Sequence, residues 1–120
     1  MKIVVTAQGQ ELSSELDLRF GRAKWLLCMD TDGDGFAAHD NVVNLHSAQG
    51  AGIQTAQNVV NLGAEAVITG NVGPNAIRTL SAGGVKVFLA EAASVQEAVE
   101  LFKAGALKEA SEANVEGHWV

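Results

Sequence analysis

Short apolar runs rich in β-branched residues alternate along this chain with polar, glycine-containing segments. The runs predict five strands, over Lys2–Ala7, Trp25–Asp30, Phe36–Val43, Ala66–Thr69 and Val85–Ala90. Three other segments carry apolar residues at helical spacing. They predict helices over Gly52–Leu62, over Pro74–Ala82, and from the cap residue Ser94 to a glycine stop at Gly105.

The order of these elements predicts an α/β fold built on a single mixed sheet. Right-handed crossovers make the later strands parallel to the first, and the opening hairpins make the second strand antiparallel to it. The predicted sheet has five strands in the order 3-2-1-4-5, flanked by helices. A length of 120 residues fits one domain, assigned to residues 1–105, and residues 106–120 are expected to form a mobile C-terminal tail.

The predicted strand order changes direction between strands one and four, and α/β proteins bind ligands in the crevice beside such a switch point. Three connections should meet there, namely Gln8–Lys24, Asn44–Ala51 and Gly70–Asn75. The first has no sustained period and predicts a long loop, with one helical turn near Ser14–Leu18. A long loop at a switch point is a candidate binding segment.

Charge is distributed unevenly along the chain. The formal net charge is -6, yet three of the eight basic residues, Arg19, Arg22 and Lys24, lie within six positions. A chain this acidic has little general affinity for nucleic acid or for an anionic membrane, so neither partner is expected. The basic segment predicts a local site for a compact anion. The alternative is a solvated loop whose arginines pair with Glu15 or Asp17.

Two glycine-containing segments lead into predicted helices. Gly50, Ala51 and Gly52 precede one helix, and Gly70–Asn75 joins a strand to the next. Free N–H groups at a helix N-terminus bind anions, and glycine allows the backbone to approach a ligand closely. A well-capped turn without any ligand explains Gly70–Asn75 equally well. The chain contains no lysine-bearing phosphate loop.

The sequence offers little for direct metal ligation or covalent catalysis. Cys28 is the only cysteine and is predicted to be buried, and the three histidines form no metal-binding pattern, although His46 near the crevice is a weak candidate. The acidic turn at Asp30–Gly35 lacks the closing glutamate of a calcium loop and predicts a hairpin. No Ser-His-Asp or Cys-His arrangement is present in the pattern, so covalent catalysis has no candidate nucleophile. With no membrane span or signal peptide, a cytoplasmic location is expected.

Three motifs in fixed order carry a family resemblance. They are Arg19-Phe20-Gly21-Arg22-Ala23, Gly50–Ala56 and Gly70–Ala76. Together they resemble the dinitrogenase iron–molybdenum cofactor biosynthesis family over about Met1–Lys108. The resemblance implies a ribonuclease H-like α/β fold, a non-enzymatic carrier or assembly role, and a ParA/MinD-type ATPase as partner. Similarity to small members of the family implies a noncovalently held molybdenum–copper sulfide cluster, with the iron–molybdenum cofactor or a precursor as the alternative.

An anionic metal–sulfur cluster brings its own sulfide and needs no protein thiolate. The basic side chains could donate charge-assisted hydrogen bonds to sulfur, the helix N-termini could add backbone donors, and apolar residues could form walls. The expected contacts are Arg19, Phe20, Gly21, Arg22, Lys24, His46, Gly50, Ala51, Gly52, Gly70, Asn71, Val72, Gly73 and Asn75. Two other functions remain open: a phosphate- or nucleotide-binding enzyme or sensor that uses the same crevice, and a protein-interaction module.

Overall fold

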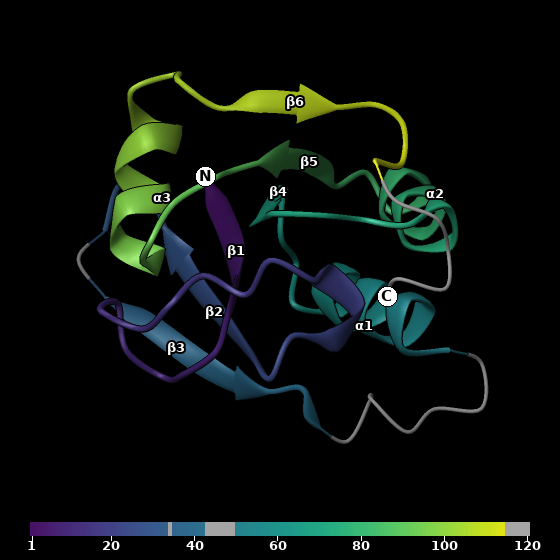
Figure 1. The fold of residues 1–120 in the computed structure, drawn as a ribbon, viewed down its shortest axis with the longest axis horizontal. Coiled ribbons are helices and arrows are strands. Elements are labelled where there is room, and N and C mark those ends of the chain that lie inside the picture. Colours follow the sequence, from purple (N-terminus) through teal and green to yellow (C-terminus); the bar gives the residue numbers. More distant parts are fainter. Residues whose placement is uncertain (34, 43–49, 115–120) are drawn as a thin grey trace.

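The computed structural model describes residues 1–33, 35–42 and 50–114 (Figure 1). Its strands are β1 (Lys2–Ala7), β2 (Trp25–Asp30), β3 (Phe36–Asp40), β4 (Ala66–Thr69), β5 (Lys86–Leu89) and β6 (Lys108–Ala110). Its helices are α1 (Ala51–Asn61), α2 (Pro74–Ala82) and α3 (Val95–Lys103), with a 3-10 turn, η1 (Phe20–Arg22), between the first two strands.

All six strands form one mixed sheet in the order β3-β2-β1-β4-β5-β6. β1 is antiparallel to β2 and parallel to β4, and β4 is parallel to β5. The predicted α/β class, the order of the first five strands and the antiparallel second strand are therefore confirmed. The switch in direction lies between β1 and β4, where the sequence places it.

The prediction of five strands is wrong, because β6 pairs antiparallel with β5 at the edge of the sheet. This strand comes from the segment predicted to be a mobile tail, which corrects that prediction over residues 108–110. Its sequence, Lys-Glu-Ala, has no apolar run, since an edge strand does not have to bury both faces. The apolar pattern that reveals central strands is therefore absent from it.

The helices cover the two faces of the sheet unequally. α1 and α2 pack on one face and α3 packs on the other (Figure 1). β1 contributes Val4 to the first core and Ile3 and Val5 to the second, and all three are fully buried. Central strands covered on both faces read as continuous apolar runs, which is why β1 and β4 are easily predicted. Each such side chain stabilises the fold by about 1.5–3 kcal/mol.

Most element boundaries agree with the sequence pattern. α2 begins and ends as predicted, whereas α1 begins one residue early because Gly50, with φ 97°, is its N-cap. The Ser94 hydroxyl accepts a hydrogen bond from the Glu97 N–H (3.2 Å) at the start of α3, as its predicted capping role requires. β3 ends at Asp40, so the predicted strand is too long: Asn41 and Val42 lie outside it, and Val43 lies outside the described residues. In the described ranges no helix is long and apolar enough to cross a membrane.

Candidate functional site

The long loop after β1 runs back along the carboxyl ends of β1 and β4. The Asp17 N–H donates to the Thr6 carbonyl (2.9 Å), and the Thr6 hydroxyl donates to the Asp17 carbonyl (2.8 Å). The Thr6 hydroxyl also lies 2.9 Å from that of Thr69, and both threonines are fully buried. Extended backbone pairing of this kind rules out the helical turn predicted near Ser14–Leu18; the turn that forms is η1, further along.

The middle of the loop is attached to the segment that follows β4. The Asn71 side-chain amide donates to the Leu18 carbonyl (2.9 Å), and the Phe20 N–H donates to the Asn71 carbonyl (3.0 Å). A Cβ on Gly70 would lie 2.7 Å from Leu18 Cδ2 and 2.9 Å from Leu18 Cα. Gly70 is therefore needed for the close approach of this loop, and the contact is made within the chain itself.

The end of the loop is held by β3 and α1. Asn41 donates through its side-chain amide to the Ala23 carbonyl (2.8 Å) and to the Thr55 hydroxyl (2.9 Å). Its backbone N–H donates to the Lys24 carbonyl (2.9 Å). Asn41, Thr55 and Ala23 are fully buried, as is the Phe20 ring. The basic side chains thus extend from a backbone that is fixed at both ends.

Asp17 organises the basic segment from within. Its carboxylate accepts a hydrogen bond from the Arg19 N–H (3.1 Å). Burial raises the pKa of this carboxyl, while backbone hydrogen bonds from Arg19 and Lys24, and the charges of both residues, oppose the rise. The sequence suggested Asp17 only as an ion-pair partner. Its position two residues before the first arginine is the signal that identifies a backbone-binding carboxylate.

The basic segment borders a polar cleft of about 510 Å³, which we call the cation-lined cleft. Its lining residues are Gln8, Glu15, Leu16, Asp17, Leu18, Arg19, Arg22, Lys24, Ala92 and Ala93. Ion pairs within the described ranges involve the Met1 amino group alone. The alternative in which the arginines pair with Glu15 or Asp17 is therefore wrong, and three cations face the cleft with no carboxylate of the described chain at ion-pair distance.

A second hollow of about 410 Å³ adjoins this cleft and shares Leu18, Ala92 and Ala93 with it. Gly70, Asn71, Ala90 and Glu91 complete its lining. Leu18 lines both hollows and is 48% exposed. The whole concavity therefore has one lobe lined by the three cations and one lobe of mixed apolar and polar lining, both at the predicted switch-point edge.

Several of the residues predicted to contact a ligand lie elsewhere. Phe20 and Gly21 belong to η1 and are buried within the loop itself, and Val72 is fully buried. The predicted contacts at the N-termini of α1 and α2, which include the N-caps Gly50 and Gly73, are absent from the lining of the cation-lined cleft, namely Gly50, Ala51, Gly52, Gly73 and Asn75. The rest of the Asn44–Ala51 connection, with His46, lies outside the described residues. In the described chain, the cleft therefore gathers Arg19, Arg22 and Lys24, and its neighbour gathers Gly70 and Asn71.

Asn114, from the predicted tail, binds the loop after β4. The Val72 N–H donates to Asn114 Oδ1 (2.7 Å), and the Asn114 N–H donates to the Val72 carbonyl (3.1 Å). Asn114 Nδ2 donates to the Gly70 carbonyl (3.2 Å) and to Asn71 Oδ1 (3.1 Å). Val72, which was predicted to form an apolar wall of the site, is instead fully buried, and its N–H is bonded to Asn114. No feature of the sequence distinguishes Asn114 from other polar residues near it.

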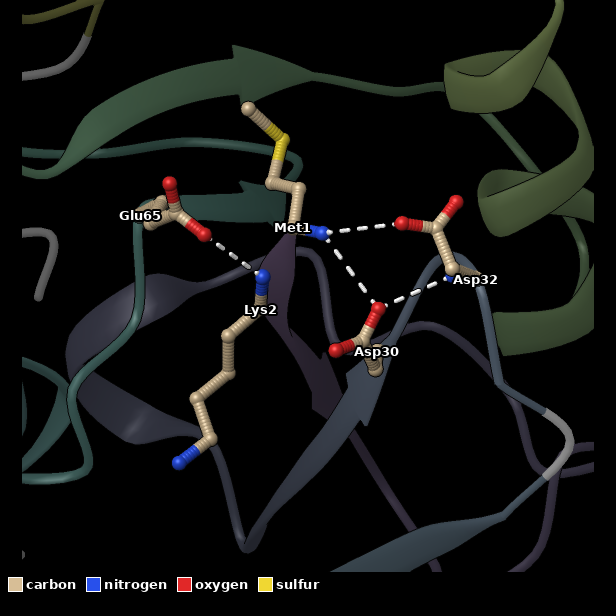
Figure 2. A network of polar contacts seen from close by, with 5 residues as sticks. All are labelled: Met1, Lys2, Asp30, Asp32 and Glu65. Carbon is tan, nitrogen blue, oxygen red and sulfur yellow. Dashed lines mark hydrogen bonds and ion pairs between the residues drawn. The ribbon is translucent and has the colours of Figure 1, made fainter.

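The acidic turn after β2 contacts the N-terminal end of β1, which lies away from the cleft (Figure 2). The Met1 amino group lies 3.3 Å from Asp30 Oδ1 and 3.7 Å from Asp32 Oδ2. The Glu65 carboxylate accepts from the Lys2 N–H (2.9 Å), so this network ties β1 to its neighbours. Asp34, the centre of the predicted hairpin turn, lies outside the described residues.

Direct metal ligation has little support in the described part of the chain. Cys28 is buried in the core, and this burial raises the pKa of its thiol, which keeps it protonated. Residues 1–33, 35–42 and 50–114 contain no group of three or more histidine, cysteine or acidic side chains that could hold a metal ion. An anion that enters the cleft must therefore be held there by charge and hydrogen bonds.

Comparisons with known proteins agree with this architecture. The apo form of the orange protein from Desulfovibrio gigas is 36% identical, with a TM-score of 0.91 over 95% of this chain and 96% of that chain. The NMR structure of a Thermotoga protein is also 36% identical, with a TM-score of 0.82 over 97% of this chain and 98% of that chain. An uncharacterised protein of Methanocaldococcus jannaschii is 26% identical over 110 residues, which span 90% of each chain. The model of the dinitrogenase iron–molybdenum cofactor family matches residues 1–105, and the chain belongs to that family.

Proposed function

We propose that this protein is a non-enzymatic carrier or assembly protein for an anionic metal–sulfur cluster, which it binds noncovalently in the cation-lined cleft. The observation that carries the proposal is that Arg19, Arg22 and Lys24 line one cleft and, within the described chain, have no acidic partner at ion-pair distance. Membership of a cofactor family supplies the class of cargo.

The chemistry of the cleft suits a cargo that brings its own sulfide. No cysteine or histidine of the described chain lines it, so the protein offers charge-assisted N–H donors instead of metal ligands. Its volume of about 510 Å³ falls within the usual range for small-molecule sites. Leu18, Ala92 and Ala93 add apolar surface, which a large and weakly hydrated anion tolerates better than a compact oxyanion does.

A phosphate or nucleotide is the second candidate, because the same three cations would attract it. Phosphate sites in α/β proteins normally add backbone N–H groups from a helix N-terminus. The first turns of α1 and α2 do not line this cleft, and the Val72 N–H is bonded to Asn114. These features favour the metal–sulfur cargo over phosphate.

The resemblance and the family relatives extend the proposal. The cargo we propose first is a molybdenum–copper sulfide cluster, as for the small orange protein that the chain resembles, with the iron–molybdenum cofactor or a precursor second. A ParA/MinD-type ATPase is the proposed partner. A ribonuclease H-like fold and a cytoplasmic location are part of the same proposal, and the strand order of β1–β5 is compatible with that fold.

The test is a titration of the protein with tetrathiomolybdate, with and without copper, followed by visible absorption. Arg19→Ala combined with Arg22→Ala should weaken binding at least about tenfold, since a unit charge about 4 Å away contributes roughly 1 kcal/mol in water and more in a cleft. The matched control is Arg78→Ala with Lys86→Ala, which removes two exposed cations outside this cleft. Equal affinities of the two double variants would refute the assigned site.

Competition separates the two candidates. Phosphate or ATP should displace tetrathiomolybdate poorly if the cleft is built for a weakly hydrated anion. Amide chemical shifts of Leu18, Arg19 and Asn71 should follow thiomolybdate and change little with phosphate. Stronger binding of phosphate than of thiomolybdate at these residues would favour the phosphate sensor instead.

A further inference from the structure

We infer that Asn114 is a positioning residue for the cation-lined cleft, which it controls through Asn71. The inference rests on the proposed function for its binding readout and goes beyond it by assigning a role to the segment after β6. That segment lies outside the family match, which ends at residue 105. It directly follows β6, which pairs with β5 at the edge of the sheet.

Two side-chain amides form a directed relay. The Val72 backbone N–H can only donate, so it fixes Asn114 Oδ1 as its acceptor (2.7 Å) and turns Asn114 Nδ2 toward Asn71 Oδ1 (3.1 Å). The Leu18 carbonyl can only accept, so it fixes Asn71 Nδ2 as its donor (2.9 Å). Both amides therefore have one orientation that satisfies every group in the relay.

The relay ends at the residue before the first arginine of the cleft. The Leu18 carbonyl belongs to the peptide group that supplies the Arg19 N–H, and this N–H donates to Asp17 (3.1 Å). Arg19 also forms a backbone bridge with Asn71, and the Phe20 N–H donates to the Asn71 carbonyl (3.0 Å). A reorientation of Asn71 would thus alter the peptide group that sets the direction of the Arg19 side chain.

Replacing Asn114 by aspartate, which turns its amide donor into an acceptor, tests this relay better than truncating it to alanine. Asn114→Asp retains an acceptor for the Val72 N–H but replaces the amide donor with an oxygen that faces the Gly70 carbonyl and Asn71 Oδ1. It should therefore turn the Asn71 amide away from Leu18. Asn114→Ala removes the donor without adding repulsion. A residue that merely filled space would tolerate the near-isosteric aspartate better than alanine.

The controls lie on the same segment. Ser111 is exposed three residues earlier, so Ser111→Ala and Ser111→Asp match the truncation and the added charge. We expect Asn114→Ala to weaken tetrathiomolybdate binding about 2- to 30-fold relative to Ser111→Ala. Asn114→Asp should weaken it further than the charge effect measured with Ser111→Asp. Affinities of both Asn114 variants within about twofold of their Ser111 counterparts would overturn the inference.

A second readout needs no ligand. In ¹⁵N spectra of the free protein, Asn114→Asp should shift the side-chain NH₂ signals of Asn71 and the amide of Phe20, whereas Ser111→Asp should leave them in place. Unchanged signals would overturn the relay whatever the binding result. If the arginine variants left thiomolybdate binding intact, the proposed function would fail, and these spectra would still decide the relay in either direction.

A double-mutant cycle tests whether Asn114 affects the cleft through Asn71. If Asn114 acts through Asn71, then Asn71→Ala with Asn114→Ala should bind thiomolybdate no more than about twofold worse than Asn71→Ala alone. Losses that multiply in the double variant would show independent action and refute the relay. Thermal melting of each variant confirms that the compared proteins are folded.

Discussion

Replacement of Gly70 by alanine tests how closely the loop that carries the cations must approach the sheet. The new Cβ would lie 2.7 Å from Leu18 Cδ2, 3.0 Å from Leu18 Cβ and 2.9 Å from Leu18 Cα. A leucine rotamer change would relieve the first of these clashes alone. The backbone of Leu18 would also have to move, although its carbonyl accepts from Asn71 and its neighbour Asp17 pairs with Thr6.

The expected cost follows from this geometry. Overpacking of a fixed contact destabilises by about 1–3 kcal/mol, which for a domain of this size lowers the melting temperature by about 4–12 °C. Because the displaced residue precedes Arg19, tetrathiomolybdate affinity should fall in the same variant. Calorimetry and the absorption titration measure the two effects separately.

Two further variants complete the test of Gly70. Gly35→Ala is the control, because a Cβ there meets no atom within 4 Å, so its melting temperature should be unchanged. Leu18→Ala in the Gly70→Ala background should restore only part of the stability, since the clash with the Leu18 backbone remains. A Gly70→Ala protein as stable as wild type, with undiminished thiomolybdate affinity, would refute the role assigned to this glycine.

Two other predictions concern the polar groups that hold the loop. Burial raises the pKa of Asp17, so the folded state binds its proton more tightly than the unfolded chain does. As the pH rises from the unfolded-state pKa of Asp17 to its folded-state pKa, wild type should therefore lose stability relative to Asp17→Asn. Melting temperatures of both proteins between about pH 3 and pH 7 measure this, and a constant difference would contradict it. Asn41→Ala leaves the Ala23 carbonyl without its side-chain donor and should cost about 1–3 kcal/mol in urea unfolding. Asn61→Ala, on the exposed end of α1, should stay within about 0.5 kcal/mol of wild type.

The central sheet and the charged residues were predictable because their signals are local. Strands such as β1 and β4 are buried on both faces, and helices such as α2 show a starting proline and a closing glycine. The basic segment stands out against a chain with a net charge of -6. In each case a few neighbouring residues differ clearly from the rest of the chain, and this difference is enough to indicate the element or the site.

The residues that shape the site have no such local signal. Asn41 holds Ala23 from the end of β3, and Asn114 holds Val72 from beyond β6. Each is a single polar residue whose partner lies 18 or 42 positions away in the chain. An isolated asparagine in a sequence suggests only a turn, and its role becomes visible only in the fold, where the sheet brings the distant segments together.

The glycine segment Gly70–Asn75 has roles in the structure that its sequence pattern does not indicate. The pattern of Gly70–Asn75 predicts backbone N–H groups that are exposed to an anion. In the structure Gly70 instead admits Leu18, and the Val72 N–H is bonded to Asn114. The segment therefore acts on the cleft by fixing the loop that bears Arg19. If anion affinity in this fold depends on such supports, Gly70→Ala and Asn114→Asp should weaken binding without removing any group that touches the ligand.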